Sequence, residues 1–247
     1  MPDHFVIVGA QRSGTTYLYG LLDEHPEIEM AKPLRPEPKF FLDYDRYALG
    51  IDAYESQLFP QAGARVRGEK STSYIESEVA ARRINAMLPD ARVILVVRDP
   101  VHRAMSNYHF SVQHGVEDLP PADALRAAAA GDREWDHTRF SVSPFDYLAR
   151  GRYAEYLDRF AAHVARDRIH VLVFEELVAD PSVVADLYER LGVDPTFMPP
   201  GSGTVVNAAV PAEEAPDAEL ETWLRDYFRG PNRQLEEFLG RPLPWPS

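Results

Sequence analysis

FVIVGAQRSGTT, residues 5–16, is the stretch of sequence that decides the architecture. Its first four residues are apolar and mostly β-branched, which predicts a short buried strand that ends at Gly9. Apolar residues then recur with helical spacing from Tyr17 to Leu22, and Pro26 ends the pattern. A strand, a glycine-containing loop and a helix are therefore expected within residues 5–25.

The same alternation continues along the chain. The strongest predicted strand is Val93–Val97, and a second one follows at 169–174. Helical spacing is found at 77–88, 153–164 and 182–191. Strands that alternate with helices predict an α/β fold, with a central parallel sheet flanked by helices. No linker interrupts the pattern, so we predict one P-loop-like domain over residues 1–247.

Three regions depart from this alternation. Residues 114–146 contain Pro120-Pro121 and a polar segment, and we interpret them as an excursion from the sheet, with a helix and a lid over a cleft. Residues 195–216 are rich in Pro, Gly and Ala, which predicts a long loop. Near the end of the chain, Gly230-Pro231 is expected to split two short helices, at 219–228 and 232–239.

Composition argues against several classes of function. The 247 residues hold 26 Lys and Arg against 39 Asp and Glu, a net charge of −13, so a nucleic-acid partner is not expected. The absence of cysteine excludes disulfides, thiol catalysis and thiolate-ligated metals. No H-E-x-x-H motif is present, and we expect no metal. Because no long apolar run occurs, we expect a cytoplasmic protein without a membrane partner.

The loop from Gly9 to Thr16 predicts an anion site. Backbone amides between a strand and the start of a helix bind phosphate groups, and G-x-x-x-x-G is the glycine spacing of the nucleotide-binding P-loop. Thr15 stands where that motif requires lysine, which argues against triphosphate chemistry, and the cation is supplied instead by Arg12. The alternative is a glycine turn that only joins the strand to the helix.

A second candidate anion site follows the strongest strand. Arg98 comes directly after Val93–Val97, at the sheet edge where open α/β sheets bind their ligands. Ser106 lies about two turns into the helix that Pro100 would begin. The two side chains could hold one further phosphate. The alternative is that Arg98 pairs with Asp99 or caps the helix.

Together these two motifs resemble those of the sulfotransferases that use 3′-phosphoadenosine 5′-phosphosulfate (PAPS). The chain is most similar to the heparan sulfate glucosaminyl N- and 3-O-sulfotransferases and their bacterial relatives. The resemblance extends in order over nearly the whole chain. It includes His25-Pro26, Glu37-Pro38-Lys39-Phe40-Phe41, Glu69-Lys70-Ser71-Thr72-Ser73-Tyr74 and Tyr227-Phe228-Arg229-Gly230-Pro231-Asn232.

The resemblance implies that PAPS is the co-substrate, that 3′,5′-ADP is the product and that no metal is needed. It assigns the 5′-phosphosulfate to the loop, and the 3′-phosphate to Arg98 and Ser106. The implied loop residues are Gln11, Arg12, Ser13, Gly14, Thr15 and Thr16.

The resemblance also implies catalytic roles. Glu37 matches the catalytic base, and Lys70 matches the lysine that contacts the transferring sulfonate. Arg12 occupies a position usually filled by lysine and would help to stabilise the transferring group. Lys39 stands where relatives often have His or Gln, so its role is open.

Each catalytic assignment has an alternative. Glu37 lies between two prolines and could be a solvated loop carboxylate, and Lys70 could pair with its neighbour Glu69. Because cytosolic small-molecule sulfotransferases use a histidine base, His109 is the reserve candidate.

One departure from the family concerns the nucleotide cover. Heparan-type relatives carry a late Lys-Gly-Arg segment there, whereas Gly201–Asn207 contains no cation. The net charge argues against a highly sulfated polyanion as acceptor and favours a small molecule or a lightly charged sugar. Residues 43–60 and 114–146 are the expected acceptor walls.

Two other functions remain open from the sequence. The first is a P-loop kinase of small molecules that requires ATP and Mg²⁺, and the second is a non-catalytic nucleotide-binding protein of the same fold. Glu37 and Lys70 together argue against the second, since a protein that only binds nucleotide needs neither.

Overall fold

A computed structural model describes residues 3–61, 63–131, 133–140, 142–200 and 215–246 of the chain. These residues form two compact units. The first is drawn from Met1–Ala10, Gly14–Val97 and Leu157–Val206, and the second from Gln11–Ser13, Arg98–Tyr156 and Asn207–Ser247. The single domain expected from the sequence stays a prediction.

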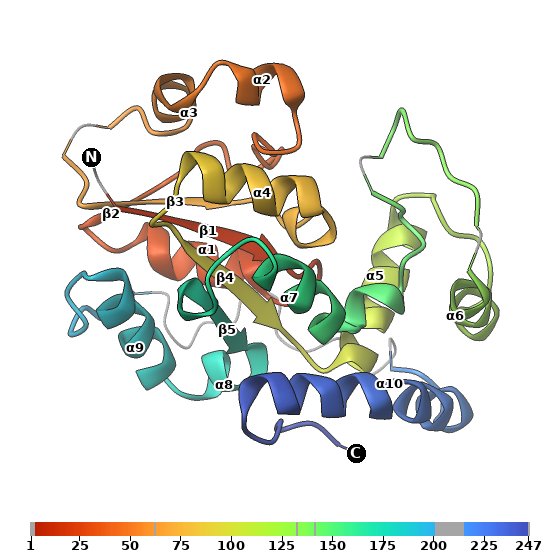
Figure 1. Ribbon diagram of the computed structural model, residues 1–247. Coiled ribbons are helices and arrows are strands. Elements are labelled where there is room, and N and C mark those ends of the chain that lie inside the picture. The colour runs from red at the N-terminus through yellow and green to blue at the C-terminus, as the bar shows by residue number, and fades with distance from the viewer. Residues whose placement is uncertain (1–2, 62, 132, 141, 201–214, 247) are drawn as a thin grey trace. The chain divides into compact units, whose positions relative to one another are not determined.

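The first unit is built on a five-stranded, entirely parallel sheet in the order β2-β3-β1-β4-β5 (Figure 1). The strands are β1 (Asp3–Gly9), β2 (Ile28–Met30), β3 (Val66–Lys70), β4 (Arg92–Val97) and β5 (Ile169–Val173). The α/β class and the strands β1, β4 and β5 confirm the predictions. The pattern did not reveal β2 and β3, because β2 has three residues and β3 carries three charged ones.

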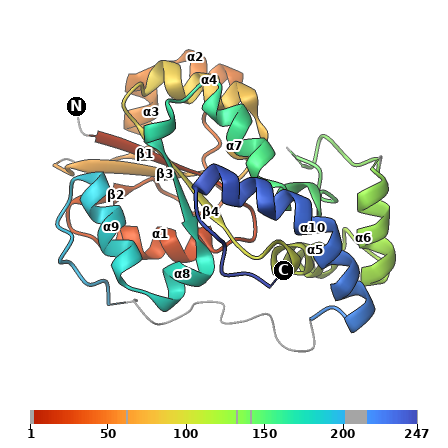
Figure 2. The same ribbon diagram turned by 60° about the horizontal axis from the view of Figure 1, so that its bottom comes forward.

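Helices cover both faces of this sheet, as predicted. They are α1 (Thr15–Asp23), α2 (Tyr44–Ala48), α3 (Ile51–Leu58), α4 (Glu78–Met87), α8 (Phe174–Ala179) and α9 (Ser182–Leu191), and α7 (Tyr153–Ala161) continues into the unit. Figure 2 shows α1 and α4 on opposite sides of the strands. Apolar side chains of β1, β4, α1, α8 and α9 form one buried cluster, which fixes the α1 face of the sheet.

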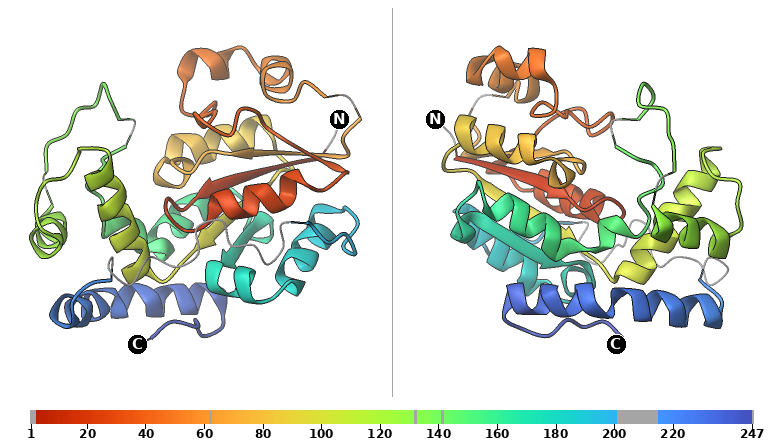
Figure 3. Two further views of the ribbon diagram at one scale, coloured as in Figure 1. Left: turned by 180° about the vertical axis from the view of Figure 1, so that it is seen from behind. Right: turned by 45° about the vertical axis from the view of Figure 1, so that its right-hand side comes forward.

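The second unit is helical. It contains α5 (Pro100–Gln113), α6 (Pro121–Ala130) and α10 (Ala218–Leu239), which appear in both views of Figure 3. Their apolar side chains share a core that includes Val101, Leu125, Tyr147, Leu224 and Phe228. The helix expected within residues 114–146 is α6, whereas the lid function of this region stays a prediction.

The expected break at Gly230-Pro231 was wrong, because α10 is one helix of 22 residues with Pro231 inside it. An internal proline removes one backbone hydrogen bond and crowds the preceding turn. The buried residues Leu220, Leu224, Phe228 and Leu235 nevertheless continue one helical face across it. The free energy gained by burying that face against the core outweighs the cost of the internal proline. The Gly230-Pro231 pair by itself could not indicate this burial.

No helix in the described ranges is long and apolar enough to cross a membrane.

Candidate active site

The loop after β1 ends at the first turn of α1. Gly14 occupies the N-cap position with φ 85°, a left-handed conformation that favours glycine, and an added Cβ there would collide with the ring of Phe174. Because this N-cap residue is a glycine, it supplies no side-chain cap to the helix. Backbone N–H groups at the start of a helix favour an anion, so the loop stays a candidate anion site.

In the second unit, Arg12, Arg98 and Ser106 come together. Arg12 Nε donates a hydrogen bond of 3.0 Å to Ser106 Oγ, and its guanidinium lies 4.9 Å from the centre of the Phe110 ring. Arg98 Nη1 donates to the carbonyl oxygen of Arg12 at 3.4 Å. Residues from two motifs that lie far apart in the sequence are therefore in contact: Ser106 with the side chain of Arg12, and Arg98 with the backbone of Arg12.

Ser13 adds a hydroxyl to the same loop. Its side chain is fully buried, and its Oγ has no hydrogen-bond partner among the described residues. A buried polar atom without a partner is costly, so an oxygen of a bound anion would satisfy it.

Tyr153 anchors the backbone of Arg98. Its hydroxyl donates to the carbonyl oxygen of Arg98 at 2.8 Å and accepts from the Arg98 N–H at 3.3 Å. The side chain of Tyr153 is buried, as expected for a position on the apolar face of its helix. The hydroxyl adds a function that the helical pattern could not show.

Asp99 caps α5 and is paired. Its carboxylate accepts from the N–H of Val101 at 2.9 Å and forms an ion pair of 2.7 Å with Arg225 of α10.

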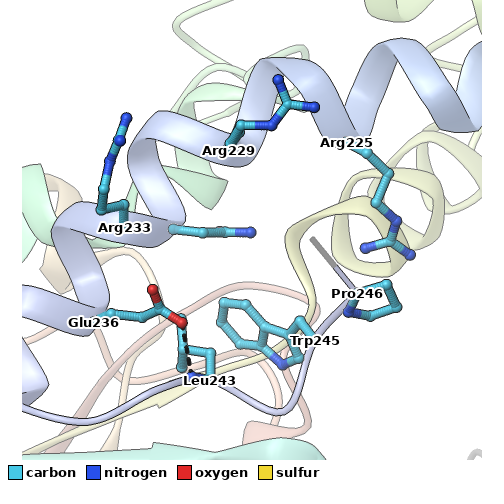
Figure 4. A pocket seen from close by; sticks show the side chains of 8 residues that line it. Arg225, Arg229, Arg233, Glu236, Leu243, Trp245 and Pro246 are labelled. Carbon is cyan, nitrogen blue, oxygen red and sulfur yellow. Dashed lines mark hydrogen bonds between the residues drawn. The ribbon is translucent and has the colours of Figure 1, made fainter.

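Arg225 also borders a pocket of about 220 Å³ in the second unit (Figure 4). Arg229, Arg233 and Glu236 of α10 line it, together with Trp245 near the chain end. The segment after α10 contacts that helix through a hydrogen bond of 3.0 Å from Leu243 N to Glu236 Oε1.

In the first unit, Glu37 and Lys70 are in direct contact. Lys70 ends β3 with 4% of its side chain exposed, and its Nζ forms an ion pair with Glu37 Oε1. Thr72 donates to the same carboxylate through its backbone N–H at 2.9 Å and its Oγ1 at 3.0 Å. Glu37 is therefore not a solvated loop carboxylate, and Lys70 pairs with Glu37 rather than with Glu69.

The Glu37 carboxylate is fixed by its contacts with Lys70 and Thr72 but remains accessible to solvent. Its side chain is 17% exposed, so a molecule from solvent can still reach it. Two residues 33 positions apart thus place an acid and an amine side by side at the end of a central strand.

Residues 37–41, here called the Glu37 segment, are irregular chain that enters a turn at Phe40. Lys39 adopts φ 49°, and its backbone N–H donates to Ser71 Oγ at 2.9 Å. Phe40 and Phe41 are fully buried. Lys39 is therefore fixed through its backbone, while the role of its side chain stays open.

Sequence reasoning missed one carboxylate of this site, Glu69. It is fully buried on β3, and burial raises its pKa to about 7 even though hydrogen bonds from Tyr74, Ser71 and Tyr54 act in the opposite direction. The signal available was its place before Lys70, in a segment that also holds Ser71 and Tyr74. No pattern in the sequence indicated that Tyr54 would donate a hydrogen bond to Glu69.

Three further predictions concern His109, the late loop and the expected absence of a metal. His109, the reserve base, lies on α5 with its ring 5.1 Å from that of Tyr108. Residues 201–207, which replace the late cationic segment of relatives, lie outside the described residues. Across the described ranges, no three His, Asp or Glu side chains gather as a metal site would require.

Comparisons with known proteins agree with the resemblance. Residues 2–212 match the family model described as the sulfotransferase domain. The chain is 28% identical, over 97% of its length, to the mouse bifunctional heparan sulfate N-deacetylase/N-sulfotransferase 4, and covers 30% of that protein. It is 33% identical, over 72% of its length, to human heparan sulfate glucosamine 3-O-sulfotransferase 6, of which it covers 48%. It thus spans less than half of either relative.

A solved structure supports the fold over the full length. The sulfotransferase from Alicyclobacillus acidocaldarius superposes with a TM-score of 0.76 at 28% identity, with 98% of this chain and 97% of that chain covered. Because residues 2–212 match the family model and the parallel sheet agrees with this fold, the chain belongs to the sulfotransferase domain family.

Proposed function

We propose that this chain is a PAPS-dependent sulfotransferase that transfers a sulfonate group to a hydroxyl or amine of a glycan or small molecule. The observation that carries the proposal is the contact between Glu37 and Lys70, with Thr72 holding the carboxylate. A protein that only bound the nucleotide would need no carboxylate beside a buried lysine.

The reaction requires one base and one cation. PAPS supplies the sulfonate, bonded to a phosphate oxygen. Glu37 takes the proton of the acceptor hydroxyl as the new O–S bond forms, a contribution of roughly 10²–10⁴-fold in general base catalysis. The S–O bond to phosphate breaks, and its electron pair stays on 3′,5′-ADP. Lys70 stabilises the charge that develops during the transfer.

Two groups of residues would bind the donor PAPS. We assign the 5′-phosphosulfate to Gln11, Arg12, Ser13, Gly14, Thr15 and Thr16, and the 3′-phosphate to Arg98 and Ser106. The unpartnered hydroxyl of Ser13 and the uncapped start of α1 support an anion at the loop. Arg98 and Ser106 each contact Arg12, one its backbone and the other its side chain, which supports a shared site for a phosphate that ATP lacks.

The acceptor is proposed from the relatives and the net charge. Relatives are named for heparan sulfate, which favours a sugar acceptor. The charge of −13 favours one with few sulfates of its own. The cytoplasmic location stays a prediction, because one relative, from Dictyostelium discoideum, is named a membrane-associated sulfotransferase.

Thermal unfolding with three nucleotides tests the donor. Ligand binding to the folded state stabilises it by about 2.7 kcal/mol at roughly 100 times Kd. We expect 3′,5′-ADP to raise Tm without a metal, and 5′-AMP to have little effect. A rise in Tm seen only with ATP and Mg²⁺ would contradict this proposal and favour a P-loop kinase of small molecules.

Transfer itself is tested with PAPS that carries labelled sulfur. Acceptors would include an unsulfated N-deacetylated glycosaminoglycan, a highly sulfated heparin and a panel of small phenols and amines. We expect label on the unsulfated sugar or a small molecule, and little on heparin. Tight binding of 3′,5′-ADP with no transfer to any acceptor class would favour the non-catalytic protein.

A further inference from the structure

Glu69 and Lys70 are consecutive on β3 and extend to opposite faces of the sheet. Lys70 contacts the side chain of Glu37. Glu69 instead faces Tyr54 of α3 and Tyr74, and none of its surface is exposed. A carboxylate in such surroundings is costly, and an apolar side chain of similar size would fill the space with less penalty. Its presence therefore needs an explanation beyond packing.

All hydrogen bonds to the Glu69 carboxylate in the described structure come from hydroxyl groups. Oε1 accepts from Ser71 Oγ at 2.8 Å and from Tyr74 OH at 2.5 Å, and Oε2 accepts from Tyr54 OH at 3.2 Å. Burial raises the pKa of Glu69 to about 7, the expected result when hydroxyls rather than a cation compensate the charge.

Two of these hydroxyls continue to the Glu37 segment. A hydroxyl has one proton to donate, so a hydroxyl that donates it to Glu69 turns its lone pairs toward other donors. Ser71 Oγ accepts from the backbone N–H of Lys39 at 2.9 Å, and Tyr74 OH accepts from that of Phe41 at 3.1 Å. The carboxylate thus orients the two hydroxyls that accept hydrogen bonds from the backbone of the Glu37 segment.

We infer that Glu69 is a positioning residue for Glu37: through Ser71 and Tyr74 it fixes the backbone of the Glu37 segment, and so places the Glu37 carboxylate beside Lys70. The inference rests on the proposed function, in which Glu37 is the base. It assigns the two neighbours on β3 complementary tasks, since Lys70 holds the side chain of the segment and Glu69 holds its backbone.

Tyr54 provides a matched control. Tyr74→Phe and Tyr54→Phe each delete one buried hydroxyl that donates to the same carboxylate. Both tyrosine rings pack against Phe41, at 5.6 Å for Tyr74 and 5.3 Å for Tyr54, and both substitutions keep the ring. Only the Tyr74 hydroxyl also accepts from the backbone of the Glu37 segment.

The first measurement is amide hydrogen exchange, which needs no acceptor. Loss of a hydrogen-bond acceptor exposes the amide to local opening, so we expect Phe41 N–H to exchange at least about tenfold faster in Tyr74→Phe than in the wild type. Ser71→Ala should do the same for Lys39 N–H. In Tyr54→Phe, both amides should keep the wild-type rate. Equal acceleration in Tyr54→Phe and Tyr74→Phe would overturn the inference.

The second measurement is steady-state transfer from PAPS to the acceptor found by the labelled-sulfur screen. Because small displacements of a catalytic group can cost up to about 100-fold, we expect kcat to fall about tenfold in Tyr74→Phe with KM for PAPS within about twofold. Tyr54→Phe should retain kcat within about twofold. A loss of kcat that is the same in both variants would show a merely structural role.

Glu69→Gln is the conservative rescue. Its amide oxygen can still accept from Ser71 and Tyr74, while its NH₂ donates to Tyr54, whose hydroxyl then accepts. We expect Glu69→Gln to keep the slow exchange of both amides, and Glu69→Leu to lose it. If the wild type transfers no sulfonate, the proposed function fails, while the exchange data still decide whether Glu69 fixes the segment.

Discussion

Arg12 Nε and Ser106 Oγ are joined by a hydrogen bond of 3.0 Å across 94 positions of the chain. One residue belongs to the glycine loop, and the other lies in the helix after the strongest strand. Arg98 Nη1 reaches the carbonyl oxygen of the same arginine. Residues of the two candidate anion motifs thus contact one another within the second unit.

Arg98→Met should weaken recognition of the 3′-phosphate. A hydrogen bond to a charged group contributes about 1.5–3 kcal/mol, so we expect the Kd of 3′,5′-ADP to rise about 10- to 100-fold. Calorimetric titration measures it, and the Kd of 5′-AMP, which has no 3′-phosphate, is the internal control. A parallel loss for both nucleotides would mean that Arg98 supports the fold rather than the phosphate.

Glu37→Gln should separate binding from chemistry. The amide cannot accept the proton of the acceptor hydroxyl, so we expect kcat to fall at least about 100-fold. Binding of 3′,5′-ADP, followed by thermal shift, should be unchanged. Glu189→Gln, an exposed acid on α9, is the control and should retain full activity. If Glu37→Gln retains the wild-type kcat, Glu37 is not the base, and His109 becomes the candidate.

Arg225→Met should destabilise the second unit. Asp99 is 2% exposed and Arg225 12%, and removal of one partner of a buried ion pair costs about 3–5 kcal/mol. Arg229, one turn further along α10, pairs with Asp226 at the surface, where both side chains are more than half exposed. Arg229→Met should therefore change the free energy of unfolding by less than about 1 kcal/mol. Urea unfolding of both variants measures the contrast, and similar losses in the two would contradict it.

Glu69 should make stability depend on pH. Its pKa rises from an ordinary 4.5 to about 7 on folding, chiefly because of burial, so the folded state binds the proton more tightly than the unfolded one. The resulting stabilisation is fully present below pH 4.5 and is lost as the pH rises through about 7. A shift of this size corresponds to roughly 3 kcal/mol.

Urea unfolding between pH 4.5 and 8.5 tests this dependence in the wild type and in Glu69→Gln. The wild type should lose stability relative to the variant over that interval, since the amide does not titrate. Parallel curves for the two proteins would show that Glu69 has a similar pKa in the folded and unfolded states. Charged or titratable groups that also act on Glu69 are Arg46, Tyr54 and Tyr74.

Much of the fold could be predicted because its signals are local. Buried parallel strands require continuous apolar runs, and β1, β4 and β5 have them. β3 was missed because its residues Arg67, Glu69 and Lys70 are charged, and only partners from distant segments make their burial possible. The continuity of α10 through Pro231 likewise depends on the core that its apolar face contacts.

The sequence by itself determined the α/β class, and it indicated the candidate anion loop and the candidates Glu37, Lys70, Arg98 and Ser106, because short-range patterns of glycine, charge and apolar residues encode them. Only the tertiary structure decided which of them meet. It paired Lys70 with Glu37 rather than with Glu69, joined Arg12 to Ser106, and surrounded Glu69 with three hydroxyls. The physical reason is that hydrogen bonds and ion pairs act over a few ångströms, and folding sets these distances between residues up to 94 positions apart.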